Sequence, residues 1–241
     1  MLEQSSVSSS VEKPHFSDQA RNALTKRGFV IYELTGITLS DHRRAGQKMW
    51  SNYYEGDTIQ GNPIDERPSR ISEVAIHPDS NKLFVSSVND VGKDKQSIQE
   101  EGYPLPKGSF VTQENILESK YPSRRLRGIA DVHAEIGSAP DVVEVVFSHY
   151  EQTGERLLGK PYGFAYTRTE TPVLGNRYIL GGEEDAFIVP EVVELRQDQT
   201  IIVGSFDEKY GLGIDNFPKG QADYFVELMP LVFPGKLTQE S

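Results

Sequence analysis

The change in sequence pattern near residue 160 is the feature that most restricts the fold of this 241-residue chain. From Tyr162 onward, short apolar or alternating pieces follow one another, among them TIIVGSF and DYFVELMPLVF. Turns that contain glycine, asparagine or aspartate separate these pieces at short intervals. This spacing is typical of an antiparallel sheet rather than of repeated βαβ units. The C-terminal half is therefore predicted to be rich in antiparallel strands.

The first half of the chain differs, because signals for helix ends and helical spacing dominate it. Ser17 is a suitable N-cap, Leu24 lies on the apolar face of the helix that follows, and Gly28 suits the helix end. A second helix is predicted from Thr38, where the sequence approximates a capping box, and its apolar spacing extends to Tyr53. Both segments predict helices.

Further elements are predicted between residue 29 and residue 136. Apolar residues recur three or four positions apart from Leu126 to Ile136 and predict another helix there. A short apolar run at 29–32 predicts a strand, and two strand-like pieces at 73–76 and 83–88 predict a hairpin. The N-terminal half is thus expected to be mainly helical, with a few strands.

The segment 139–159 carries conflicting signals. Ser138 and Asp141 have the spacing of a capping box, and apolar residues recur with His149 at helical intervals, which favours a helix. The density of valine favours a hairpin instead, because β-branched side chains fit a pleated sheet well. We favour the helix, and the choice decides where the imidazole of His149 points.

Together these patterns predict an α+β fold with helices mainly in the N-terminal half and an antiparallel, β-rich C-terminal half. Residues 1–14 are polar and rich in serine, and are predicted to form a flexible tail. Residues 15–241 are predicted to form a single globular unit. If that unit contains a boundary, the change of pattern places it near residue 160.

Composition limits the classes of function. The chain has 36 acids against 25 bases, a net charge of -11, and this excess of negative charge argues against general nucleic-acid binding. It has no cysteine, which excludes disulfides, thiolate nucleophiles and cysteine-ligated metals. The N-terminus lacks the pattern of a secretory signal, and no apolar run is long enough to span a membrane. A soluble, acidic, cytoplasmic protein without a membrane contact is expected.

The motifs of common enzyme classes are missing. The sequence contains no G-x-S-x-G, no G-x-x-x-x-G-K-S/T, no G-x-G-x-x-G and no H-E-x-x-H. Candidate catalytic groups are His133, Glu135 and His149, but their spacing does not bring them together. No cofactor is predicted, and whether the chain is an enzyme stays open at this point.

The run Asp131-Val-His133-Ala-Glu135 is the nearest approach to a metal constellation. On a strand the three polar side chains would share one face, as a metal site requires. On a helix Asp131 and Glu135 would share a face while His133 points away from both. Because the surrounding apolar spacing indicates a helix, no metal site is predicted.

Arg124, Arg125 and Arg127 form a basic run that follows a possible N-cap at Ser123. Cations are unfavourable at the positive end of a helix, so the run needs an explanation. The helix runs through from Thr112 with a kink at Pro122, or the arginines pair with acids elsewhere in the chain. Alternatively, they bind an anionic ligand, phosphate or carboxylate, together with free helix amides.

Two hypotheses about function follow. The first is a non-enzymatic binding or assembly protein, whose strand edges pair with a protein partner or with a second copy of the chain. The alternative is an enzyme or small-molecule receptor for an anionic ligand held by Arg124, Arg125 or Arg127, with His133 or Glu135 acting on it. The absence of catalytic motifs favours the first.

Overall fold

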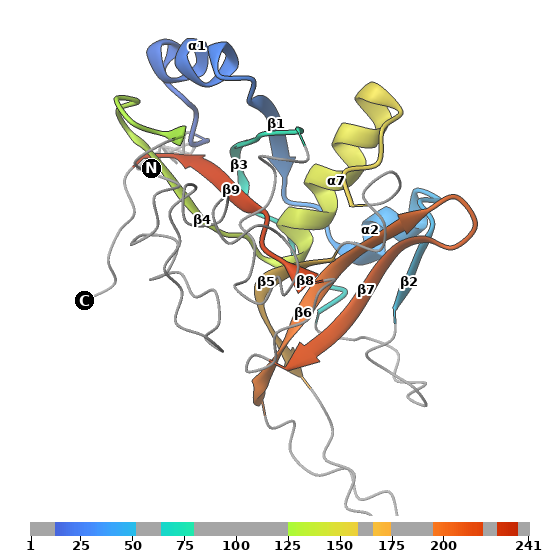
Figure 1. Cartoon of the computed structure of the whole chain (residues 1–241). Coiled ribbons are helices and arrows are strands. Elements are labelled where there is room, and N and C mark those ends of the chain that lie inside the picture. The colour runs from blue at the N-terminus through green and yellow to red at the C-terminus, as the bar shows by residue number, and fades with distance from the viewer. Residues whose placement is uncertain are drawn as a thin grey trace, which may run out of the picture.

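The computed structural model of the chain describes residues 13–51, 64–79, 125–158, 166–174, 195–218 and 226–235. Within these residues it contains two β-sheets with a long helix packed between them (Figure 1). The helices are α1 (Asp18–Lys26), α2 (Leu39–Arg44) and α7 (Ala139–Thr153). The strands are β1 (Val30–Thr35), β2 (Met49–Ser51), β3 (Ile71–Ile76), β4 (Val132–Ile136), β5 (Tyr166–Leu174), β6 (Leu195–Asp207), β7 (Gly211–Pro218), β8 (Val226–Glu227) and β9 (Pro230–Pro234).

The first sheet has four antiparallel strands in the order β1-β3-β9-β4. β1 and β3 pair along their whole length, from Val30 opposite Ile76 to Thr35 opposite Ile71. β4 and β9 also pair completely, but β3 and β9 share only the pair Ala75 and Val232. The middle of this sheet is therefore its weakest seam.

Proline explains that short seam. Alternate residues of a strand direct their amides to opposite sides, so Pro230, Val232 and Pro234 face the same neighbour. Proline has no amide hydrogen, and on this edge only Val232 can donate to β3. Beyond that pair, the amide of Glu73 donates to the carbonyl of Pro14, 3.1 Å away. The segment before α1 thus fills the gap that the prolines leave.

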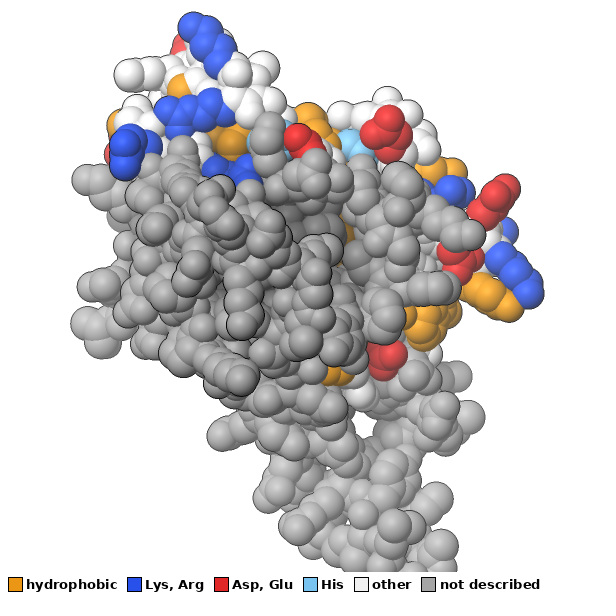
Figure 2. All heavy atoms as spheres, in the orientation of Figure 1, with side chains coloured by type: hydrophobic (Ala, Val, Ile, Leu, Met, Phe, Trp, Pro, Cys, Tyr) orange, Lys and Arg blue, Asp and Glu red, His pale blue; other side chains and the backbone are white. Residues whose placement is uncertain are grey.

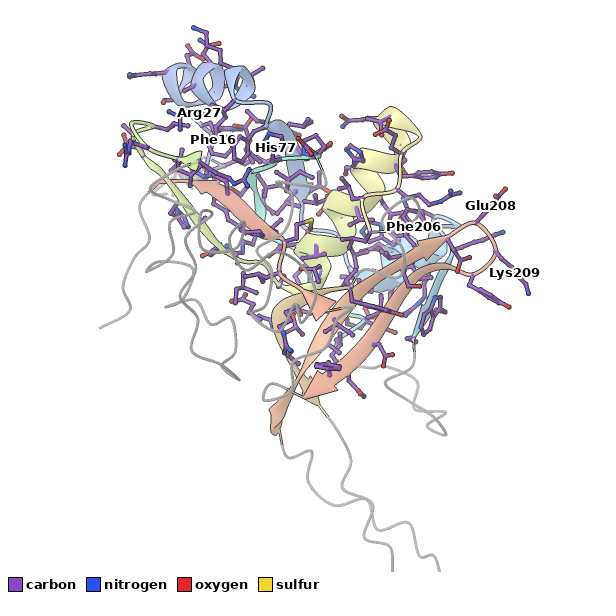
Figure 3. The ribbon with its side chains drawn as sticks, viewed as in Figure 1. Phe16, Arg27, His77, Phe206, Glu208 and Lys209 are labelled. Carbon is purple, nitrogen blue, oxygen red and sulfur yellow. The ribbon has the colours of Figure 1, made fainter. Side chains whose placement is uncertain are left out.

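The second sheet has five strands in the order β2-β7-β6-β5-β8. Its central pairs, β6 with β7 and β6 with β5, are antiparallel, while the outer strands β2 and β8 pair in parallel. A tight turn joins β6 to β7, and Figure 3 shows Glu208 and Lys209 at its tip. The predicted strand TIIVGSF forms part of β6 here, whereas DYFVELMPLVF is divided between β8 of this sheet and β9 of the first.

The helix α7 lies between the two sheets and forms the centre of the core. Ser138 and Asp141 make the predicted capping box, and Gly154 ends the helix in the left-handed conformation with φ of 76°. Every residue from Ala139 to Phe147 is buried. One apolar cluster joins the helix to residues such as Leu34 of the first sheet and Ile201 of the second. The helix predicted for 139–159 is confirmed over Ala139–Thr153.

The helix α1 covers the opposite face of the first sheet. Ser17 caps it as predicted, and its buried residues Ala20 and Leu24 pack in a cluster with Ala75 of β3 and Val232 of β9. The first sheet is thus covered by α1 on one face and by α7 on the other. Its strands alternate apolar side chains between the two helices.

The prediction of a mixed α+β fold is confirmed, but the predicted division between halves is wrong. The longest described helix, α7, lies in the second half of the chain, and β1 to β3 come from the first. The error has a physical cause. Short apolar runs such as 71–76 form central strands as readily as the longer runs do, once strands from the other half pair with them.

Two predicted helices are also corrected. The helix from Thr38 ends at Arg44, and Met49–Ser51 forms β2, which pairs with β7. Residues 132–136, predicted to be helical, form β4. Both segments gain a ladder of hydrogen bonds with distant strands, which outweighs their local helical spacing. The predicted strand at 83–88 and residues 1–12 of the predicted tail lie outside the described residues.

Candidate functional site

Arg70 occupies the centre of the largest described cluster of charges. Its guanidinium contacts Glu135 of β4, the buried Asp141 of α7 (Nε to Oδ2, 3.1 Å) and Glu170 of β5 (3.5 Å). Its plane also lies 4.3 Å from the centre of the Phe233 ring. The cluster joins both sheets to the start of α7. Three carboxylates surround this one cation, so it is poorly suited to bind an anionic ligand.

His133 and Glu135 lie side by side, contrary to the helical prediction. On β4 they share a face, and His133 Nε2 is 3.5 Å from Glu135 Oε2. His133 Nδ1 lies 3.0 Å from the carbonyl of Gly235, to which it donates. Burial lowers the pKa of His133, an effect that the Gly235 bond opposes and the charge of Arg70 reinforces. The imidazole is therefore neutral near pH 7.

These contacts do not assemble a metal site in the described part of the chain. No group of three or more His, Asp or Glu side chains there is arranged to hold a metal ion. Asp131 precedes β4 with φ of 55° and is exposed, and the side chain of Glu135 is bound to Arg70. Among the described residues, His133 and Glu135 thus contact each other, and Glu135 pairs with Arg70.

Glu144 is a buried carboxylate that links α7 to the end of β1. It is 3% exposed, and it accepts hydrogen bonds from the amide and hydroxyl of Thr35 at 2.8 and 2.7 Å and from the hydroxyl of Ser69. The amide of Thr35 points away from β3, so Glu144 reaches it around the edge of the sheet. The sequence alone gives no sign of these contacts, because Thr35 and Ser69 are distant from Glu144 along the chain.

His149 also ties α7 to β1, through Tyr32. Both side chains are buried, and Tyr32 Oη lies 2.6 Å from His149 Nδ1. Burial raises the pKa of Tyr32 to about 12 and lowers the pKa of His149, which the charge of Glu155 partly offsets. Tyr32 and His149 thus form a buried hydrogen bond between two groups whose neutral forms are favoured by burial. His149 itself is 3% exposed.

Of the predicted arginine cluster, the structure describes two residues, Arg125 and Arg127. Arg124 lies outside the described residues, Arg125 is half-buried and Arg127 is exposed. Arg27, at the end of α1, donates to the carbonyls of Arg125 and Arg127 at 2.6 and 2.5 Å. Lysine and arginine side chains gather over α1 and the adjoining turn (Figure 2), and Figure 3 labels Arg27 there. Sequence reasoning missed Arg27, which is about a hundred residues away along the chain.

The outer edge of β1 is a further candidate, and its backbone orientation follows from three contacts. Glu73 and Ala75 of β3 bond to Pro14 and β9, so they face away from β1. Their partners in the register, Glu33 and Ile31, therefore direct their amides and carbonyls outward. The outward amide of Thr35, bound to Glu144, agrees with this assignment.

Ile31 and Glu33 consequently present unpaired backbone at the edge of the first sheet. Neither amide has a hydrogen-bond partner in the part of the chain that the structure describes. The side chain of Glu33 is 62% exposed and lies 3.3 Å from Lys13, whereas Thr35 at the end of the strand is occupied. In Figure 1 this edge lies between α1 and α7. The sequence indicates a strand here but not that it is an edge strand.

Comparisons with known proteins found no matching family model, no matching curated protein and no matching solved structure. Among the described helices, none is both long and apolar enough to cross a membrane.

Proposed function

We propose that this chain is a non-enzymatic binding or assembly protein that pairs with an extended strand of its partner along the outer edge of β1. The observation that carries the proposal is the outward-facing backbone of Ile31 and Glu33, which has no hydrogen-bond partner within the described ranges of the chain. A strand with free amides and carbonyls accepts another strand by main-chain hydrogen bonds, which supply affinity, while its side chains supply specificity.

The surroundings of β1 support strand addition. Helix α1 covers one face of the first sheet and α7 covers the other, so the two helices flank the outer edge of β1. Tyr32, in the middle of β1, is held by His149 and does not have to reorder when a partner binds. Glu144 occupies the amide of Thr35 and so sets where an added strand must stop. A rigid, short edge lowers the entropy lost on binding.

The alternative, an enzyme or receptor for an anionic ligand, has less support. The guanidinium of Arg27 already donates to two backbone carbonyls, and that of Arg70 already contacts three carboxylates. Arg127 remains exposed and is the described residue on which that alternative depends. The alternative predicts that Arg127→Ala abolishes binding of phosphate without changing the melting temperature.

The variant Glu33→Pro tests the proposal directly. Proline removes an amide that points outward, so no hydrogen bond to β3 is lost, and proline is tolerated on edge strands. We expect the variant to fold and to lose association, measured as the concentration dependence of the sedimentation coefficient and as retention of co-purifying partner. The matched control Glu33→Gln keeps the amide and should keep association, weakened by no more than about threefold through the loss of the exposed charge.

A second measurement on the unmodified chain protects the test if Glu33→Pro is unstable. Hydrogen exchange of the Ile31 and Glu33 amides should be fast in the isolated monomer and slow in the associated state. Association that leaves both amides exchanging rapidly would place the contact elsewhere. A monomer with a deep pocket that binds a small molecule would contradict the proposed class.

A further inference from the structure

We infer that the segment added at the edge of β1 comes from a different protein and carries a basic side chain opposite Glu33 and an apolar one opposite Ile31. This inference rests on the proposed function and adds the chemistry of the partner. It follows from the side chains that share a row with the edge and from the charge they leave unmatched.

The row that contains Glu33 has an excess of negative charge. Glu33 lies directly opposite Glu73 of β3 on the face covered by α1, and like charges in this position repel. The two carboxylates are handled differently. Glu73 is buried and holds Arg21, His15 and the amide of Phe16. Glu33 is exposed and has one cation, Lys13.

The contact between Glu33 and Lys13 leaves part of the carboxylate free. Lys13 Nζ lies 3.3 Å from Oε2, and no described contact involves Oε1 of Glu33. An added strand would place its side chain about 5 Å from that of Glu33, directly opposite it in the row. A lysine or arginine at this position would reach Oε1 and continue the alternation of charge across the sheet.

The neighbouring row calls for an apolar side chain. Ile31 lies opposite Ala75, which in turn lies opposite Val232, so this row is apolar across three strands. In an antiparallel partner, the residue opposite Ile31 comes two positions after the residue opposite Glu33. The partner pattern is therefore basic, any residue, then valine or isoleucine.

Charge disfavours a second copy of the chain as the occupant. Each copy has a net charge of -11, and two-fold pairing centred on Glu33 would set two carboxylates opposite each other. Pairing centred on Tyr32 would avoid that contact, but it would bring the start of the second β1 against Glu144 at Thr35. A short segment of another protein meets neither obstacle.

The test is an NMR titration of the full chain with two synthetic peptides, acetyl-Thr-Lys-Thr-Val-Thr-amide and its counterpart with glutamate in place of lysine. We expect the lysine peptide to shift the amide resonances of Ile31 and Glu33 and to bind about threefold more tightly than the glutamate peptide, as an exposed ion pair allows. In the variant Glu33→Lys the preference should reverse. Glu33→Pro should bind neither peptide.

The outcomes separate the two proposals. Equal binding of both peptides at Ile31 and Glu33 would overturn the inference about charge while leaving strand addition intact. If neither peptide shifts these amides, both the inference and the proposed function fail. If the same amides shift with protein concentration and no peptide, a second copy is the occupant, which overturns the inference and supports assembly.

Discussion

One apolar cluster joins α7 to both sheets, but the hydrogen bonds and ion pairs that α7 makes to the two sheets differ in kind. On the side of the first sheet, α7 uses ionisable side chains: Asp141 pairs with Arg70, Glu144 accepts from Thr35, and His149 is hydrogen-bonded to Tyr32. On the side of the second sheet, the contacts are apolar or made by neutral hydroxyls. Phe147 packs edge-on against Phe206 at 5.5 Å, and Thr171 accepts from the first amide of the helix.

This difference separates stability from specificity. Apolar packing stabilises in proportion to buried area and tolerates rearrangement, whereas buried polar groups must find their partners in one geometry. The first sheet also has a short central seam and an edge strand, β1, whose Ile31 and Glu33 amides have no partner among the described residues. We infer that its polar contacts fix the position of β1, while apolar packing joins α7 to both sheets.

The largest expected effect is on the apolar side. Phe206→Ala removes a buried ring that packs against Phe147 and Tyr150, and should lower the free energy of unfolding by about 4 kcal/mol. Urea unfolding monitored by circular dichroism measures this loss. Because the ring does not titrate, the loss should be equal at pH 7.5 and 5.5. A loss in the free energy of unfolding that differs between the two pH values would contradict the assignment of this contact as purely apolar.

The next effect is on the polar side. Asp141→Ala leaves Arg70 and the amide of Ser138 without a buried partner, and should cost about 3 kcal/mol in the same unfolding experiment. The matched control is Glu170→Ala, because Glu170 contacts the same arginine but its side chain is 48% exposed. That control should cost less than about 1 kcal/mol. Similar costs for the two variants would show that burial does not distinguish them.

The dependence of stability on pH should come from the buried histidines. Burial lowers the pKa of His149, His42 and His133, so the unfolded chain takes up protons more readily than the folded one. This contribution is fully present above about pH 6.5, the ordinary pKa of histidine, and is lost as the pH falls below it. His149→Gln should therefore flatten the plot of melting temperature against pH below that value.

The control for this experiment is Tyr210→Gln, since Tyr210 is an exposed turn residue. Its plot should follow that of the unmodified chain. An NMR titration of the imidazole of His149 provides a direct check. If the pKa of His149 were at or above the ordinary value for histidine, His149 would not lower the stability of the fold at acidic pH, and the prediction would be wrong.

The smallest effect concerns the outer strand of the second sheet. A Cβ at Gly213 would lie 2.7 Å from the ring of Trp50, the single tryptophan of the chain. Gly213→Ala should displace the ring from β7, shift its fluorescence to longer wavelength and cost about 1 kcal/mol. Tyr210→Ala, at an exposed turn residue, should leave the emission unchanged. An unchanged spectrum in Gly213→Ala would show that the ring can move without losing its environment.

Sequence reasoning succeeded where the controlling contact is local. The capping boxes at Thr38 and Ser138 and the cap at Ser17 form as predicted. It failed at 132–136, where helical spacing and strand alternation both fit the sequence. The pairing of β4 with β9, about a hundred residues away, decided between them. His133 and Glu135 therefore share a face, contrary to the helical prediction.

By itself the sequence determined the start of each described helix and the presence of strands in both halves of the chain. Capping depends on atoms within one turn of the same segment, so the local sequence contains the information. The tertiary structure alone decided which strands pair, which carboxylates contact Arg70 and that β1 is an edge strand. Each of these depends on contacts between distant segments. For example, β3 bonds to Pro14 and pairs with Val232 on its side away from β1, so the amides of Ile31 and Glu33 point outward.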